Sequence, residues 1–164
     1  MVQELLSSPL IADVIVRASL EKKLAEGKAL RIKIGMDPTA PDLHIGHAVA
    51  LRLLKQFQDA GHTIVFIIGD YTARIGDPSG KSKTRPQLDA SEIDANAQTY
   101  LAQVGKILDV THAEVVMNST WLSKLSFADL IHLTAHFTAA RLLERDDFAK
   151  RLKAGVDISA HELL

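Results

Sequence analysis

Cysteine is absent from this 164-residue sequence, which therefore has no disulfide and no thiolate ligand for a metal. No apolar run approaches the length that crosses a membrane, and the first residues, with Glu4 and Asp13 among short apolar runs, are unlike a signal peptide. Neither sign of charge dominates, because the formal net charge is −1 and gives no general attraction for nucleic acid. We therefore expect a cytoplasmic protein without a membrane contact, whose RNA contacts are confined to local patches.

The length and composition are those of one compact domain. Hydrophobic residues make up 47% of the chain and charged residues 24%, which is ordinary for a folded globular protein. Residues 1–164 are expected to form one unit with three parts: a helical segment over 1–28, an α/β part over 29–118 and a helical region over 119–164.

Hydrophobic spacing in the first half predicts a strand–helix–strand unit. Apolar residues recur at helical spacing over 3–26, and they alternate as in a strand over 29–35. A proline-containing loop over 36–43 leads into a helix that ends at Gly61, and 63–69 is a continuous apolar run typical of a buried parallel strand. This unit should be a right-handed βαβ crossover.

The second half continues the alternation. A polar loop over 70–90 precedes a helix near 91–108 and a short strand over 114–118. Residues 123–153 have helical spacing, and another helix is expected to start near Asp157. The predicted fold is α/β, with a Rossmann-like open parallel sheet and flanking helices.

The loop between the first strand and its helix carries the strongest chemical signal. It contains Asp37-Pro38-Thr39 and then Asp42-Leu43-His44-Ile45-Gly46-His47. In open α/β folds this edge of the sheet binds ligands, and the amino end of a helix attracts phosphate.

Two histidines at this helix start are spaced for one anion. His44 and His47 are three positions apart, so both imidazoles can donate to the same phosphate, and Thr39 can add a hydroxyl donor. Gly46 has no side chain and would let a flat purine approach the backbone. The alternative is that Asp42 caps the helix and the histidines have no role.

A second cationic segment, residues 76–85, follows the next strand. Lys81 and Arg85 are four positions apart and are spaced to clamp a polyphosphate, while Asp77 can accept a substrate ammonium. The spacing of the glycines before Lys81 is not that of a Walker phosphate loop, which excludes that class. The alternative is an ordinary solvated basic loop.

Four segments together resemble the bacterial tyrosyl-tRNA synthetases, a class I family: residues 35–39, 44–47, 56–62 and 75–81. The resemblance extends from about residue 29 to the last residue. Tryptophanyl enzymes share the His-Ile-Gly-His element, but the Gly-Asp-Pro-Ser-Gly-Lys loop is much more specific to the tyrosyl family. The resemblance implies the first half of the class I catalytic fold plus a helical insertion, with 29–118 as the nucleotide-binding half.

The resemblance implies ATP, with Mg²⁺, and L-tyrosine as substrates, and tRNA(Tyr) as a partner of the complete enzyme. The implied ATP-binding residues are Gly35, Asp37, Thr39, His44, Gly46, His47, Lys81 and Arg85. Of these, Thr39, His44, His47, Lys81 and Arg85 would stabilise phosphate charge while the tyrosine carboxylate attacks the α-phosphate. The implied tyrosine-binding residues are Lys33, Asp77, Asn118 and Trp121. Many members have tyrosine in place of Lys33, and one branch of the family carries lysine there.

The helical region 119–164 is similar to the dimer-interface region of the family, which implies a homodimer. Ordinary core and dimer contact are both open for its apolar residues Leu130, Leu133, Phe137, Leu142 and Leu143. Arg145 matches a family position that touches the tRNA acceptor end, although acidic residues interrupt the basic run 141–153 as in a solvated face. His132 and His136 have a zinc-like spacing, but no third ligand is evident, and no protein-bound metal is expected.

The family continues beyond the position of Leu164 with further tyrosine-binding residues, two more strands, a KMSKS-type ATP loop and anticodon-binding domains. The 164 residues alone are therefore expected to lack useful synthetase activity, with the strand at 30–34 as an exposed edge. One rival hypothesis is a half-domain that binds nucleotide or dimerises without catalysis. Another is a different adenylyl-transferring enzyme with a His-Ile-Gly-His element, against which the loop at 76–81 argues.

Overall fold

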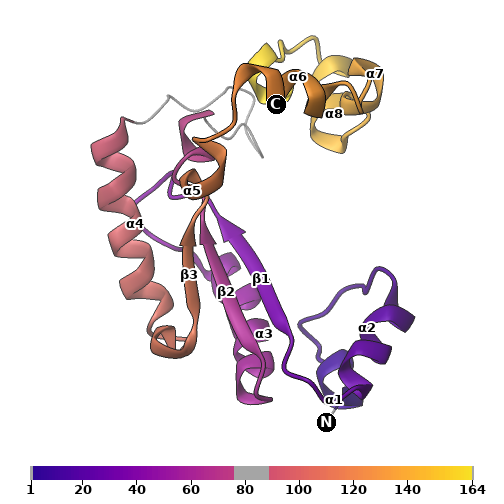
Figure 1. The fold of residues 1–164 in the computed structure, drawn as a ribbon, viewed down its shortest axis with the longest axis vertical. Coiled ribbons are helices and arrows are strands. Elements are labelled where there is room, and N and C mark those ends of the chain that lie inside the picture. Colours follow the sequence, from indigo (N-terminus) through magenta and orange to yellow (C-terminus); the bar gives the residue numbers. More distant parts are fainter. Residues whose placement is uncertain (1, 76–88, 164) are drawn as a thin grey trace.

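Three parallel strands form the centre of the protein in a computed structural model that describes residues 2–75 and 89–163 (Figure 1). The strands are β1 (Arg31–Met36), β2 (Thr63–Ile68) and β3 (Glu114–Met117), in the order β1-β2-β3. Helix α3 (Ile45–Asp59) joins β1 to β2, and α4 (Ala90–Val104) precedes β3. The predicted open parallel α/β sheet is confirmed, and β1 lies at an edge of it within the described residues, as expected.

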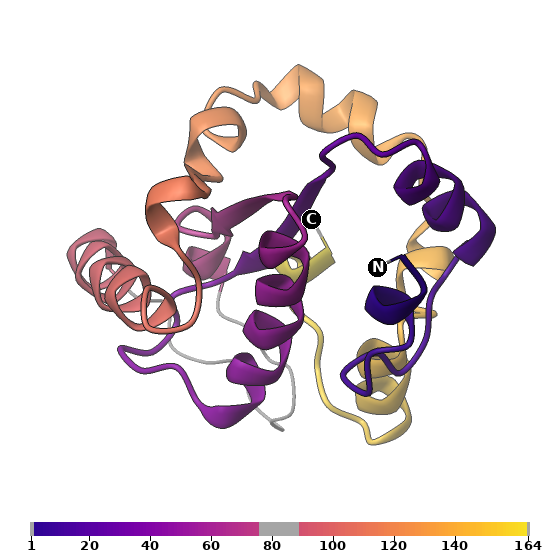
Figure 2. The same cartoon turned by 90° about the horizontal axis from the view of Figure 1, so that it is seen from below.

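The core lies on one face of this sheet, because α3 and α4 both cover that face (Figure 2). From β2, Ile64, Phe66 and Ile68 point into it and are at most 1% exposed. The two helices contribute their apolar stripes, which include Leu51, Leu54, Phe57, Ala97, Tyr100 and Val104. This packing fixes the helix starts relative to the carboxyl ends of the strands, where the candidate site lies.

The opposite face of the sheet is only partly covered. Arg31, Lys33 and Gly35 of β1 are exposed, in alternation with the inward-facing residues of the same strand. Val65 and Ile67 of β2 lie on this second face beside them. The continuous apolar run of β2 therefore has apolar residues on both faces, as a central parallel strand should.

The single helix predicted over 3–26 is wrong. Two helices, α1 (Val2–Leu6) and α2 (Arg17–Ala25), are separated by an irregular segment. Pro9 cannot sit in a helix interior, and the Ser8 hydroxyl accepts the Leu10 N–H at 3.4 Å, so local side-chain bonding replaces helical bonding. Apolar spacing continued across this break and hid it. Both helices lie near the amino end of β1 (Figure 1).

The stretch 123–153 is helical as predicted, but it is divided by polar caps. Helices α6 (Phe127–Thr134), α7 (Ala139–Leu142) and α8 (Asp146–Lys153) follow the short α5 (Ser119–Leu122). Ser126 and Thr138 accept backbone N–H groups of α6 and α7, which is why new helices start there. These helices lie beyond the carboxyl ends of the strands (Figure 1).

Three short 3₁₀ turns complete the described structure. They are η1 (Thr72–Ile75), η2 (Val110–His112) and η3 (Ala160–Leu163). The helix expected to start near Asp157 is therefore only the turn η3. Within the described residues, none of the helices has the length and apolar character that crossing a membrane requires.

Candidate nucleotide site at the carboxyl ends of the strands

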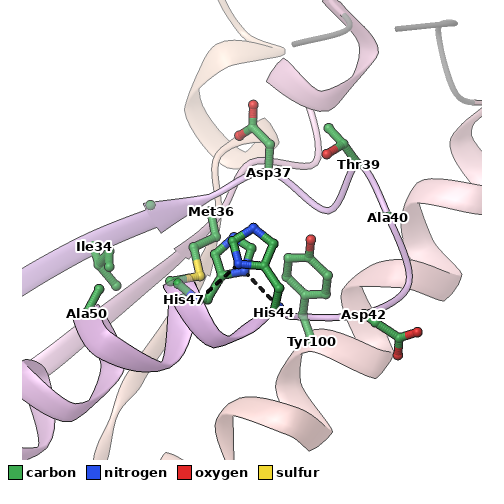
Figure 3. A pocket seen from close by; sticks show the side chains of 12 residues that line it. Ile34, Met36, Asp37, Thr39, Ala40, Asp42, His44, His47, Ala50 and Tyr100 are labelled. Atoms are coloured by element: carbon green, nitrogen blue, oxygen red, sulfur yellow. Dashed lines mark hydrogen bonds between the residues drawn. The ribbon is translucent and has the colours of Figure 1, made fainter. Parts of the chain in front are cut away.

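A cavity of about 740 Å³ opens where β1 ends and α3 begins (Figure 3). It is lined by every described residue that the sequence predicted to bind ATP, namely Gly35, Asp37, Thr39, His44, Gly46 and His47. The lining also includes Asp42, which the sequence analysis considered as a helix cap, and Tyr100, which it did not single out. Tyr100 comes from α4, so two helices and one strand end enclose the cavity.

The two histidines form a capping box at the start of α3. His44 is the N-cap, and its Nδ1 accepts the Gly46 N–H at 3.1 Å. The Nδ1 of His47 accepts the His44 N–H at 3.1 Å, and the two rings are stacked with centroids 3.9 Å apart (Figure 3). The alternative that Asp42 caps this helix is therefore wrong.

The capping bonds determine which nitrogen of each ring can meet a ligand. A neutral imidazole whose Nδ1 accepts a hydrogen bond carries its proton on Nε2. His44 and His47 therefore both present an N–H donor on the side away from their capping bonds. The stacked rings lie on the same wall of the cavity.

His47 has the more enclosed ring of the pair. Burial lowers the pKa of His47 below 6.5, and repulsion from the protonated form of His44 would lower it further. The ring is therefore neutral near pH 7 and acts as a hydrogen-bond donor without a full charge. Tyr100 lies beside it, with ring centroids 6.5 Å apart.

The absence of a side chain at Gly46 has a structural reason other than the predicted approach of a purine. A Cβ at this position would lie 3.0 Å from Cε1 and Nδ1 of His44. The missing side chain therefore leaves room for the His44 ring to fold back over the first turn of α3. This contact supports the capping bond directly.

Helix α4 holds the loop that leads to His44. Gln103 uses both ends of its amide, because Oε1 accepts the Leu43 N–H at 2.8 Å and Nε2 donates to the Pro41 carbonyl at 2.9 Å. Thr99 also donates to Pro41, and Asn96 donates to the Pro38 carbonyl at 3.1 Å. Sequence analysis missed these contacts, although polar residues at 96, 99 and 103 share one helix face.

A hydrogen-bond chain joins the carboxyl ends of all three strands. Thr72 Oγ1 donates to Asp37 Oδ1 at 2.9 Å, and Asn118 Nδ2 donates to Thr72 Oγ1 at 2.9 Å. Asn118 Oδ1 accepts the Tyr71 N–H at 2.9 Å. Asn118, predicted to bind tyrosine, is buried and uses both ends of its amide in this chain.

Two other residues predicted to bind tyrosine line a second cavity, of about 330 Å³, on the partly covered face of the sheet. Lys33 of β1 and Trp121 of α5 lie on its walls with Arg31, while Val65, Ile67 and Val116 are its apolar lining. The sequence positions of Lys33 and Trp121 are far apart, and the parallel sheet brings them together.

The remaining predicted residues are placed elsewhere or not described. Asp77, Lys81 and Arg85 lie outside the described residues. Arg145 binds Asp147 with two hydrogen bonds of 3.2 and 3.0 Å, and its guanidinium lies 4.5 Å from the centroid of the Phe148 ring. Within residues 2–75 and 89–163, no three His, Asp or Glu side chains gather as a metal site.

Parallel strands that end beside a helix start are the architecture of open α/β nucleotide-binding folds. The chain belongs to the family described as tRNA synthetases class I (W and Y), whose sequence model matches residues 25–164.

Curated relatives of this chain are tyrosine–tRNA ligases. The protein from Carboxydothermus hydrogenoformans is 58% identical over 143 residues, which are 87% of this chain and 35% of the relative. The protein from Deinococcus radiodurans is 54% identical over 156 residues, which are 94% of this chain and 38% of the relative. The chain thus spans little more than a third of the length of these relatives.

A solved structure supports the fold independently. The chain is similar to a C-terminally truncated mitochondrial tyrosyl-tRNA synthetase from Aspergillus nidulans, with a TM-score of 0.80 and 26% sequence identity. The match covers 99% of this chain and 49% of that one. The sheet and its flanking helices therefore have the arrangement of that catalytic domain.

Proposed function

We propose that this chain supplies the ATP-phosphate side of a tyrosine–tRNA ligase, which activates L-tyrosine with ATP and transfers it to tRNA(Tyr). The observation that carries the proposal is the pair of stacked imidazoles at the start of α3, both of which line the cavity. The identity of 54% to a curated ligase from Deinococcus radiodurans supports tyrosine as the amino acid.

The first step is attack of the tyrosine carboxylate on the α-phosphate of ATP. A bond forms between carboxylate oxygen and phosphorus, and the bond to the β-phosphate breaks, so tyrosyl-adenylate and pyrophosphate are the products. The carboxylate is already a nucleophile, so no general base is required. Catalysis then depends on positioning and on donors to the phosphates.

The phosphate donors are proposed from two segments of the sequence. His44, His47 and Thr39 bind phosphate oxygens in this proposal, and Lys81 and Arg85 complete the set. Each such contact contributes roughly 2 to 4 kcal/mol in the transition state. ATP would arrive as its Mg²⁺ complex, because phosphate oxygens are good ligands for that ion.

Substitution of His44 tests the proposal if the new side chain still caps the helix but cannot donate to the phosphate. Asparagine is a good N-cap and can accept the Gly46 N–H, but it has no group in the place of Nε2. We expect His44→Asn, in the protein at its full encoded length, to lower tyrosine-dependent ATP–pyrophosphate exchange about 100-fold. Tyrosine affinity by equilibrium dialysis and the free energy of unfolding should stay near those of the wild type.

His44→Ala is the matched comparison, because alanine removes both the cap and the donor. It should lose stability by about 1 kcal/mol in addition to activity. An active His44→Asn protein would contradict the phosphate role. A large loss of tyrosine affinity in either variant would show that His44 belongs to the amino-acid site.

The exposed apolar residues of α6 support a homodimer as part of the same proposal. Phe127 is 77% exposed, Ile131 53% and Phe137, just after the helix, 53%. Leu133 is also half exposed, so it and Phe137 are not core residues of the single chain. Large exposed apolar patches mark interaction sites, and a second copy is the proposed partner. Sedimentation should give a dimer mass, and Phe137→Asp should shift it to a monomer.

Arg145 is proposed to contact tRNA through its exposed side chain. The bonds to Asp147 and the stacking on Phe148 hold its guanidinium in one place, on the outside of α8. Arg145→Ala should reduce tRNA charging while pyrophosphate exchange is unchanged. Equal charging by the variant and the wild type would remove this assignment.

A further inference from the structure

An ion pair crosses the partly covered face of the sheet from one edge strand to the other. Arg31 of β1 donates to Glu114 of β3 with two parallel bonds, Nε to Oε1 at 3.0 Å and Nη2 to Oε2 at 2.5 Å. The two residues are 83 positions apart in the sequence. The pair spans the central strand β2 and lies at the end of the second cavity that is opposite Trp121.

The strand register places a second cation, Lys33, where it could compete with Arg31 for the Glu114 carboxylate. Val65 is aligned with Lys33 on one side and with Glu114 on the other, so Lys33 and Glu114 occupy the same level of the sheet. Lysine and arginine side chains are of similar length, and Arg31 already spans these two strands. An unpaired Glu114 carboxylate would therefore be within reach of the Lys33 ammonium.

Lys33 itself is exposed and has no ion pair among the described residues. The Glu114 carboxylate, the charged acceptor nearest to it in the sheet register, is held by both bonds of the Arg31 fork. The ammonium of Lys33 therefore remains as the unpaired charge of a cavity whose lining is otherwise mostly apolar. One unpaired cation above Val65, Ile67 and Val116, beside an arginine whose charge Glu114 balances, suits a flat apolar ligand that ends in one oxygen.

We propose that Arg31 is a positioning residue, which holds Glu114 so that the Lys33 ammonium stays available for the phenol oxygen of the amino-acid substrate. This inference rests on the proposed function, because it assigns the second cavity to the tyrosine side chain. The inference also explains how the site could select tyrosine over phenylalanine. A site that is built to bind a hydroxyl discriminates against the analogue that lacks it, here phenylalanine.

The size of the effect follows from the exposure of the pair. The side chain of Arg31 is 67% exposed and that of Glu114 is 42% exposed, so solvent screens their interaction. Exposed ion pairs are weak, so a change of at most about five-fold in an equilibrium constant is expected. A competing Lys33–Glu114 pair should weaken tyrosine binding by a factor of this order.

A double-substitution cycle tests the inference in the protein at its full encoded length. In Arg31→Ala the KM for tyrosine in pyrophosphate exchange should rise about three- to five-fold with kcat unchanged. The KM for phenylalanine should not change, because that substrate has no phenol oxygen. Adding Glu114→Gln to Arg31→Ala should restore the tyrosine KM, since glutamine cannot form an ion pair with Lys33.

The matched control is Arg17→Ala, which removes an exposed arginine from an ion pair with Glu21 on α2, away from this face. Its kinetic constants should equal those of the wild type. If the double variant keeps the raised KM of Arg31→Ala, the pair has only a structural role and the inference is wrong, while the proposed function stands. If the wild type shows no tyrosine-dependent exchange at all, the proposed function fails and this inference fails with it.

Discussion

The carboxylate of Asp37 occupies the space into which a side chain at Gly69 would project. A Cβ at position 69 would lie 1.7 Å from Asp37 Oδ1 and 2.7 Å from Thr72 Oγ1. Asp37 follows β1 and Gly69 follows β2, whose last residues Met36 and Ile68 are register partners. The close approach of two neighbouring strand ends is therefore what places the Asp37 carboxylate at the edge of the nucleotide cavity.

Gly69→Ala should displace Asp37 from this position. The added methyl group must push the carboxylate away from Thr72, so we expect a loss of about 1 to 3 kcal/mol in the free energy of unfolding, as for other overpacked sites. Urea denaturation measures the loss, and pyrophosphate exchange should fall with it. Gly35→Ala is the stability control, because a Cβ there would be 4.0 Å from its nearest neighbours. Equal stability of the two variants would contradict the steric explanation.

The pKa of His47 should lie below the ordinary histidine value of 6.5. Its pKa in the folded chain lies below 6.5, first because of burial and then because of the His44 charge. Protonation would also remove the acceptor that caps the His44 N–H. The stability that the neutral ring contributes is complete above pH 6.5, and it is lost as the pH falls through the folded pKa.

NMR titration of the imidazole carbon protons measures this pKa directly. In His44→Asn the neighbouring charge is absent, so the pKa of His47 should rise while staying below 6.5, since burial remains. An unshifted pKa of His47 in the wild type would show that its ring is not enclosed in solution.

Gln103 should affect the nucleotide site without touching it. Gln103→Ala removes both bonds to the loop before His44, so the imidazole pair loses its fixed position. We expect pyrophosphate exchange to fall about ten-fold or more, since small misplacements of catalytic groups are costly. Gln98→Ala, an exposed glutamine on the same helix, should leave exchange unchanged, and a similar loss in both variants would point to a general weakening of α4.

Glu162 and Arg151 should stabilise the end of the described chain. Their side chains are 2% and 10% exposed, and Arg151 Nη1 lies 2.5 Å from Glu162 Oε2. Hydrogen bonds from Arg151 lower the pKa of Glu162, so the stability of the pair is present above the ordinary glutamate pKa of 4.5 and is lost at lower pH.

Glu162→Gln leaves the Arg151 charge without its partner, which costs about 3 to 5 kcal/mol for a buried pair. Hydrogen exchange of the Ser159 amide, which donates to Glu162 at 2.9 Å, should become faster by a corresponding factor. Glu144→Gln is the control, because its pair with Arg141 is exposed and should contribute less than about 1 kcal/mol. Unchanged exchange in Glu162→Gln would mean that the pair does not stabilise this segment.

The sheet and the location of the first site followed from local patterns. The run 63–69 is apolar without interruption, and only a central parallel strand needs that pattern. The shared face of His44 and His47 also followed from their spacing, because a helix places positions three apart on one side. Residue spacing did not predict the capping box. The group that caps a helix depends on the backbone geometry at its first turn.

Helix boundaries were less predictable, and for a physical reason. Apolar periodicity over 3–26 is compatible with one helix or with two, and a single Pro9 decided between them. In the same way Ser126 and Thr138 divided one helical stretch, because each hydroxyl can bond either within a helix or at its start.

By itself, the amino-acid sequence determined the α/β class, the parallel strands and the helix start that carries His44 and His47, because these depend on residues close together in the chain. Only the tertiary structure decided that Gln103 holds the loop before His44, that Asn118 reaches Asp37 through Thr72, and that Arg31 holds Glu114 beside Lys33. Those contacts join residues 35 to 83 positions apart. Strand register and helix packing bring such residues together, and no local pattern records either of them.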